Sequence, residues 1–170
     1  PYAPIETIVA SLRRDLIHGA FPGDISTNTG EEDEIFINGL RVKITREKDP
    51  DKAWRGRGLF GVIEASGAFR ERGKATRHLN ETGVQHVLIT APSADSDLSL
   101  VRGINDSEFT GQQVVDNASC TTKSALAVVQ TLDREFGVGD VDLETVHAAT
   151  GSELQMLMDR MRLRNANSEA

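Results

Sequence analysis

The segments LFGVIEASG (Leu59–Gly67) and VQHVLITAP (Val84–Pro92) decide the fold class. Each is a short apolar run of the kind that forms a buried strand, the first ending in small residues and the second stopped by proline. Between them, residues 70–81 are polar and compatible with a helix that ends at Gly83. A strand, a helix and a second strand form a βαβ unit, which predicts a parallel sheet and an α/β fold.

The N-terminal part predicts a helix and a hairpin ahead of this unit. Apolar residues recur at helical spacing over residues 5–16, and Gly19 follows. The acidic run 30–34 is expected to be a solvated loop. Two β-rich runs within residues 35–44 flank Asn38-Gly39, the strongest short hairpin signal.

The C-terminal part alternates strands and helices in the same way. Val114-Val115 predicts a short strand that leads into a helix with an apolar stripe, closed by Gly137. Residues 141–148 predict a further strand, and the basic tail 153–164 is helix-prone.

Composition excludes several function classes. The chain has 170 residues, and its net charge of −7, from 19 basic and 26 acidic residues, argues against a general nucleic-acid or membrane-surface binder. No apolar run approaches the ~18 residues that a spanning helix needs. A single cysteine excludes an internal disulfide framework and a thiolate zinc cage, so we expect no metal and a reducing, cytoplasmic setting. Pro1 opens directly into an amphipathic pattern, which favours an excerpt of a longer protein over a signal peptide.

The lone cysteine, Cys120, lies where the chain passes from strand to helix. Asn117 and Ser119 are good N-cap types, which places Cys120 in or near the first helical turn. The helix dipole favours a thiolate there and raises its reactivity at neutral pH. A buried structural cysteine is the alternative that these residues leave open.

A nucleophilic thiol also needs a base, and four histidines are candidates. His78 lies in the polar helix and is expected to be solvated, while His86 lies in a strand and His18 beside a helix end. His147 lies on the strand predicted after the Cys120 helix, and that strand returns to the same edge of the sheet. His147 is therefore the histidine best placed to meet Cys120.

Several motifs in order resemble one family. The run Asn117-Ala-Ser-Cys-Thr-Thr122 resembles the active-site sequence of phosphorylating glyceraldehyde-3-phosphate dehydrogenase, and residues 145–150 resemble the family's base-carrying strand. The further matching stretches are Val62–Phe69, Val87–Ser93, Gly103–Asn105, His18-Gly19 and His78-Leu79. The resemblance covers nearly all of residues 5–150.

The resemblance implies a two-part oxidoreductase, usually a tetramer. Residues 1–119 would form a partial NAD(P)-binding domain, a Rossmann-type parallel sheet lacking its first βα unit. Residues 120–170 would begin the α+β catalytic domain. The implied reaction is the oxidation of glyceraldehyde 3-phosphate to 1,3-bisphosphoglycerate with inorganic phosphate in glycolysis or gluconeogenesis. The isolated chain would lack half of both sites and is expected to have little activity.

The resemblance also implies roles for individual residues. Cys120 would attack the aldehyde and form a thioester, and His147 would activate the thiol and steady the oxyanion. Ser119 and Thr121 would hold substrate or the attacking phosphate, and Thr150 would hold the substrate's own phosphate.

The resemblance also implies residues that bind the cofactor and one that binds phosphate. Lys48, Ser66, Gly67 and Thr90 would line the cleft for NAD or NADP. Arg164 would be a phosphate-binding arginine in a shortened loop.

Departures from the family pattern keep alternatives open. The glycine-rich phosphate loop and the acidic residue that binds the ribose are absent from the sequence, so NAD and NADP both remain candidates. Lys123, Ser124 and Ala149 replace residues usual in the family. A sibling that acts on erythrose 4-phosphate is one alternative, although Thr150 favours the triose. The other alternative is an inactive fragment that serves as a binding module.

Overall fold

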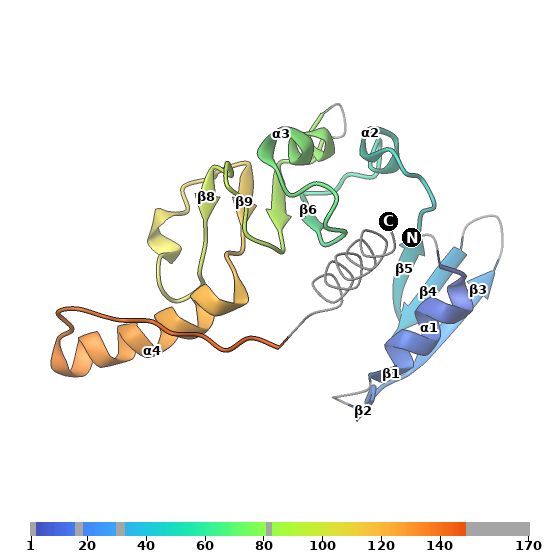
Figure 1. Ribbon diagram of the computed structural model, residues 1–170. Coiled ribbons are helices and arrows are strands. Elements are labelled where there is room, and N and C mark those ends of the chain that lie inside the picture. Colours follow the sequence, from blue (N-terminus) through green and yellow to red (C-terminus); the bar gives the residue numbers. More distant parts are fainter. Residues whose placement is uncertain (1–2, 16–18, 30–32, 81–82, 149–170) are drawn as a thin grey trace, which may run out of the picture. The chain divides into compact units, whose positions relative to one another are not determined.

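The structure is a computed structural model that describes residues 3–15, 19–29, 33–80 and 83–148 (Figure 1). The chain separates into two compact units, Pro1–Ser119 and Cys120–Ala170. This division falls where the resemblance places a change of domain. That the units are a cofactor domain and a catalytic domain remains a prediction.

The first unit begins with a helix and an antiparallel sheet. Ile5, Val9, Ile25 and Ile35 form one buried cluster of this unit. Its elements are α1 (Ile5–Arg13), β1 (Arg14–Asp15), β2 (Gly19–Ala20), β3 (Ile25–Thr29), β4 (Asp33–Ile37) and β5 (Leu40–Ile44), with sheet order β3-β4-β5.

The predicted hairpin is confirmed in β4 and β5. Asn38 and Gly39 between them have φ values of 50° and 80°. A two-residue turn of this type needs both residues in the left-handed region, which asparagine tolerates and glycine adopts freely.

Two expectations for this region are wrong. The helix stops at Arg13, because Arg14 and Asp15 pair as extended backbone with Ala20 and Gly19. The acidic run is not wholly a solvated loop, since Glu34 lies in β4 with 7% exposure and accepts hydrogen bonds from the Arg41 guanidinium. A buried carboxylate needs such a partner.

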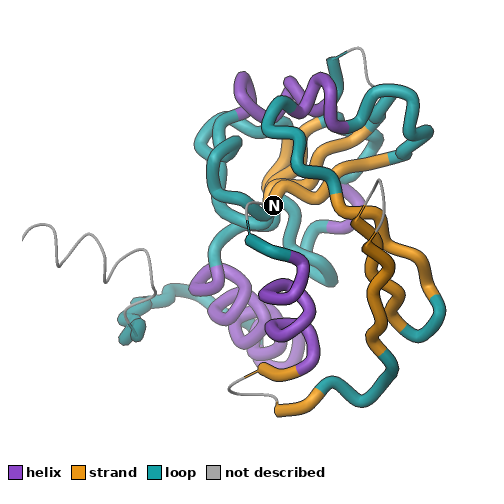
Figure 2. Tube along the Cα trace, turned by 90° about the vertical axis from the view of Figure 1, so that its right-hand side faces the viewer, coloured by secondary structure: helices purple, strands orange, loops and turns teal. Residues whose placement is uncertain are grey.

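The second sheet is parallel, with strand order β6-β7-β9-β8, which confirms the βαβ unit and the α/β class. Its strands are among the segments drawn in orange in Figure 2. Its cluster of buried residues consists of Ala75, Val87, Ile89 and Val114. The predicted helix over residues 70–81 is shorter, one turn of α-helix and one of 3-10 helix. The elements are α2 (Pro50–Ala53), β6 (Gly61–Glu64), α3 (Arg72–Ala75), η1 (Thr76–His78), β7 (His86–Ile89), β8 (Leu98–Ser99), η2 (Asp106–Glu108) and β9 (Val114–Asp116).

The described part of the second unit is one long helix and an extended segment. The helix α4 (Cys120–Phe136) is confirmed, and Gly137, with φ of 72°, ends it by donating its N–H to the Asp133 carbonyl. The strand predicted over residues 141–148 is wrong: the segment is extended but forms no strand with any described residue. Its side chains are exposed, Val146 fully so.

Within the described part of the chain, no helix combines the length and the apolar character that crossing a bilayer requires.

Candidate active site

The site is built around the start of α4. Cys120 is the first residue of this helix and is exposed. The free N–H groups of the first turn and the positive end of the helix dipole stabilise an anion at this position. The prediction that Cys120 lies at the helix start is therefore confirmed, and the alternative of a buried structural cysteine is wrong.

The thiol faces one imidazole from the extended segment. Cys120 Sγ lies 3.1 Å from Nε2 of His147, 27 residues downstream. The other ring nitrogen, Nδ1, lies 2.6 Å from the carbonyl oxygen of Ala148, to which it donates when protonated. That hydrogen bond leaves Nε2 to accept the thiol proton or, in the ion pair, to donate to the thiolate. The two side chains meet although the predicted strand does not form.

The imidazole changes the acidity of the thiol. The pKa of Cys120 is lowered from its ordinary value, chiefly by the hydrogen bond with His147. Partial desolvation opposes this shift, whereas the charge of His147 and hydrogen bonds with Thr121 add to it. A thiol with a lowered pKa holds more thiolate at neutral pH, and the thiolate is the nucleophile.

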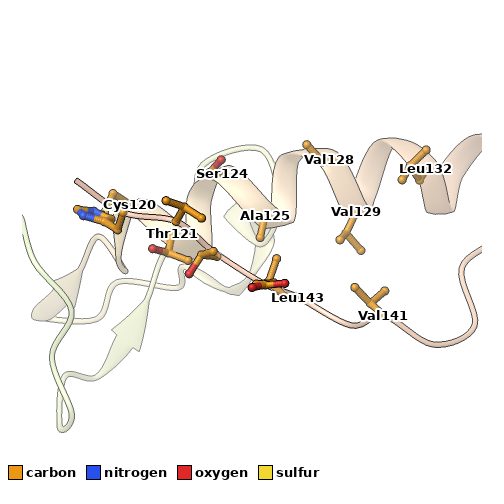
Figure 3. Close-up of a pocket in the computed structure, with 13 residues that line it drawn as sticks. Cys120, Thr121, Ser124, Ala125, Val128, Val129, Leu132, Val141 and Leu143 are labelled. Atoms are coloured by element: carbon orange, nitrogen blue, oxygen red, sulfur yellow. The ribbon is translucent and has the colours of Figure 1, made fainter. Parts of the chain in front are cut away.

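A groove of about 540 Å³ runs from the thiol along α4 (Figure 3). Cys120 and Thr121 lie at one end, and Val128 and Leu132 lie along the helix toward the other. Most of its wall is apolar, which suits neither phosphate nor a sugar hydroxyl. Cys120, Thr121 and His147 lie together at one end, and Ser124, Glu144 and Thr145 are the other polar residues of the lining.

The remaining predicted substrate residues are placed only in part. Thr121 lines the groove beside Cys120, and Ser119 directly precedes α4. Thr150 and Arg164 lie outside the described residues, as does His18 among the candidate bases. The catalytic and binding roles of these residues stay predictions.

Three of the four predicted cofactor residues lie in the first unit at the carboxyl ends of neighbouring parallel strands. Ser66 and Gly67 follow β6, and Thr90 follows β7 and donates its N–H and its hydroxyl to the Glu64 carbonyl. Gly67 has a φ of 77° and open space where a Cβ would stand. In open α/β sheets, ligands bind at this edge, so the arrangement fits a nucleotide.

A cavity of about 180 Å³ joins the fourth cofactor candidate to this group. Lys48 and Ser66 both line it, together with the aromatic rings of Trp54 and Phe69. A cation, a hydroxyl and flat rings around one small cavity suit a nucleotide base and its sugar.

His78 lies at the same cavity and corrects an expectation. The prediction that His78 is solvated is wrong, because it is 4% exposed and bonds through Nε2 to Glu64 Oε2 at 3.0 Å. Trp54 donates its indole N–H to His78 Nδ1 at 2.9 Å. The remaining histidine of the parallel sheet, His86, is half-buried, and its Nδ1 lies 3.0 Å from the Gln112 carbonyl. Among the described histidines, only His147 has a contact with Cys120 described by the structure.

Asp116, which ends β9, is not among the residues that the sequence predicts for the site. Its side chain is fully buried, and Oδ2 accepts from the hydroxyls of Ser96 and Ser99. Oδ1 accepts from the Ala118 N–H at 2.7 Å. Ala118 has a φ of 50°, which is uncommon for a residue other than glycine. An acidic residue directly after two buried valines was the available signal.

The fold and the site together define a class: an α/β protein whose parallel sheet leads into a helix that starts at a histidine-paired thiol. No family model matches the chain. It is 33% identical over 166 residues to "Glyceraldehyde-3-phosphate dehydrogenase 2" of Bacillus subtilis, covering 96% of this chain and 48% of that protein. It is also 34% identical over 167 residues to the glyceraldehyde-3-phosphate dehydrogenase of Thermotoga maritima, covering 97% of this chain and 49% of that protein.

A fungal relative agrees with these two. The chain is 37% identical over 155 residues to the glyceraldehyde-3-phosphate dehydrogenase of Mycosarcoma maydis, which covers 90% of this chain and 44% of that protein. The resemblance predicted from the sequence is therefore confirmed: the chain is similar to part of a glyceraldehyde-3-phosphate dehydrogenase. It spans about half the length of the curated relatives that it matches.

Proposed function

We propose that the chain carries the reactive thiol and part of the cofactor site of an NAD(P)-dependent, phosphorylating glyceraldehyde-3-phosphate dehydrogenase. The observation that carries this proposal is the 3.1 Å contact between Cys120 Sγ and His147 Nε2 at the start of α4. The similarity to named dehydrogenases over 90–97% of the chain supports the same conclusion. The activity belongs to the full-length protein, because the chain spans only about half of these relatives.

The thiol and the imidazole supply the covalent chemistry. His147 Nε2 takes the proton of Cys120, and the thiolate sulfur forms a bond to the aldehyde carbon of glyceraldehyde 3-phosphate. The carbonyl oxygen becomes an oxyanion, to which the protonated Nε2 donates. After oxidation, the carbon is held as a thioester on Cys120. An oxygen of inorganic phosphate then attacks that carbon, which releases 1,3-bisphosphoglycerate and returns the thiolate.

The cofactor would be held at the strand ends of the first unit. When bound, NAD or NADP would supply a nicotinamide ring as the acceptor for the hydride of the carbon bonded to Cys120. The open space at Gly67 would let a ligand approach the backbone closely, Thr90 would line the same edge of the sheet, and Lys48 would supply a positive charge at the neighbouring cavity.

Anions would be bound near the start of α4. The first-turn N–H groups of a helix bind phosphate readily, and the hydroxyls of Ser119 and Thr121 would add to them. Thr150 and Arg164, which follow later in the sequence, would also bind phosphate. We further propose a cytoplasmic homotetramer that works in glycolysis or gluconeogenesis.

The experiment follows NADH or NADPH formation by the full-length protein from glyceraldehyde 3-phosphate and from erythrose 4-phosphate, each with and without inorganic phosphate. The proposal expects phosphate-dependent turnover of the triose. Phosphate-independent oxidation of the tetrose would instead indicate the erythrose-4-phosphate sibling. No oxidation of either aldehyde, with Cys120 no more reactive than free cysteine, would indicate a binding module.

A further inference from the structure

A chain of hydrogen bonds crosses the first unit from Trp54 to Ser66. The Trp54 indole N–H donates to His78 Nδ1 at 2.9 Å, and His78 Nε2 lies 3.0 Å from Glu64 Oε2. The other carboxylate oxygen, Oε1, accepts from the Ser66 N–H at 2.7 Å and from the Ser66 hydroxyl. Four residues from three parts of the chain, next to α2, η1 and β6, are thereby linked.

The donors and acceptors fix the proton positions in this network. An indole N–H can only donate, so His78 Nδ1 must accept and carries no proton. A neutral imidazole with a bare Nδ1 carries its proton on Nε2, which therefore donates to Glu64. Glu64 accepts on both oxygens, as an ionised carboxylate does.

The network ends at the turn that follows β6. Ser66 is held by its own N–H and hydroxyl, and its Oγ also accepts from the Ala68 N–H at 3.1 Å. Gly67 between them bends the chain with a φ of 77°. The Phe69 ring packs edge-on against His78, with 5.0 Å between ring centroids.

The bond between His78 and Glu64 lies in the nearly buried part of the network. His78 is 4% exposed and Glu64 5% exposed. Removing the imidazole would leave a buried carboxylate oxygen without this donor, and a buried charge without its partner is strongly destabilised. Glu64 Oε2 would then lose its anchor, so the carboxylate could rotate and its two bonds from Ser66 through Oε1 would no longer be held in one geometry.

We propose that His78 is a positioning residue for the cofactor: held in one tautomer by Trp54, it orients Glu64, which fixes the Ser66–Gly67 turn against which the adenine dinucleotide binds. The proposal rests on the function proposed above, because it takes the ligand of this turn to be NAD or NADP.

The first test measures the dissociation constants of NAD and NADP for the full-length protein by calorimetry. His78→Leu removes both hydrogen bonds and is expected to weaken binding by about tenfold or more. His78→Gln places an amide donor near the Nε2 position and is expected to restore affinity to within about threefold of the original. Val87→Ala, a deletion in the core of the same sheet, is the control for lost stability and should leave affinity within about twofold.

The second test observes the tautomer directly. Nitrogen-15 spectra of labelled histidine should show His78 with a bare Nδ1 and a protonated Nε2. Trp54→Phe removes only the indole donor, so a mixture of tautomers and weaker cofactor binding should appear together. A single unchanged tautomer in this variant would overturn the proposed role of Trp54.

The outcomes separate this inference from the function on which it rests. If the original protein binds the cofactor and His78→Leu binds it equally well, the inference is overturned and the proposed function stands. If Val87→Ala weakens binding as much as His78→Leu, the effect is one of stability alone, and the positioning role is overturned. If the original protein binds neither cofactor, both proposals are overturned.

Discussion

Replacing Asp116 by alanine is expected to destabilise the first unit by about 2–4 kcal/mol. The fully buried carboxylate of Asp116 accepts three hydrogen bonds, from Ser96, Ser99 and the Ala118 N–H. Ser96 is half-buried and Ser99 is exposed, so both hydroxyls can turn toward water and each loses about 1 kcal/mol or less. The Ala118 N–H is buried and cannot turn, so its loss costs about 1–3 kcal/mol.

Asp116→Asn is the matched control. The amide oxygen still accepts from the Ala118 N–H, and the amide NH₂ donates to the two hydroxyls, which rotate to accept. This variant should lose about 1 kcal/mol, because only the charge-assisted part of the bonds is removed.

The assay is urea unfolding followed by tryptophan fluorescence, since Trp54 is the only tryptophan of the chain. Amide exchange at Ala118 should also accelerate in Asp116→Ala and stay slow in Asp116→Asn. Equal losses in the two variants, or a loss below about 0.5 kcal/mol in Asp116→Ala, would refute the reasoning that the carboxylate holds this turn.

Three further predictions follow from the same geometry. His147→Asn in the full-length protein should slow turnover by roughly 10²–10⁴-fold, the range for losing an acid–base group, with little change in cofactor affinity. Equal steady-state rates in the variant and the original protein would contradict the mechanism. Gly67→Val should cost about 1–2 kcal/mol in unfolding experiments, because a φ of 77° strains a branched residue although space is open, whereas an unchanged midpoint would mean that the turn relaxes freely. The pKa of Asp97 is lowered, chiefly by its hydrogen bond with Arg72. The pair therefore stabilises the fold fully at pH values above the pKa of an unfolded aspartate, near ~3.9. This stabilisation is lost as the pH falls through the lower pKa of the folded state. Arg72→Gln should therefore flatten the dependence of stability on pH in that acidic window, and acid titrations that superimpose would count against the pair.

Much of the fold could be predicted because its signals are local. Asn38-Gly39 specifies its hairpin through backbone conformation alone, and the parallel sheet follows from apolar runs separated by a polar segment. The start of α4 at Cys120 follows from the residues before it. The same local logic failed for residues 141–148, since β-branched residues form a strand only where a partner strand is present.

The candidate site was predictable in its chemistry but not in its surroundings. The pairing of Cys120 with His147 was expected from sequence order and family resemblance, and the two side chains lie in contact. The burial of His78 could not be predicted, because its partners Trp54 and Glu64 are 24 and 14 residues away. A polar segment predicts exposed side chains, and this prediction fails for a residue that forms hydrogen bonds with residues distant in sequence.

The most direct test of the central claim is the rate at which iodoacetamide alkylates Cys120 as a function of pH. Only one cysteine is present, so the label reports one site. Since thiolate is the reactive form and His147 lowers the pKa of Cys120, the rate should rise at a lower pH than for a free thiol near ~8.5, and His147→Asn should move that rise upward. A profile that matches free cysteine and does not change in His147→Asn would contradict the account.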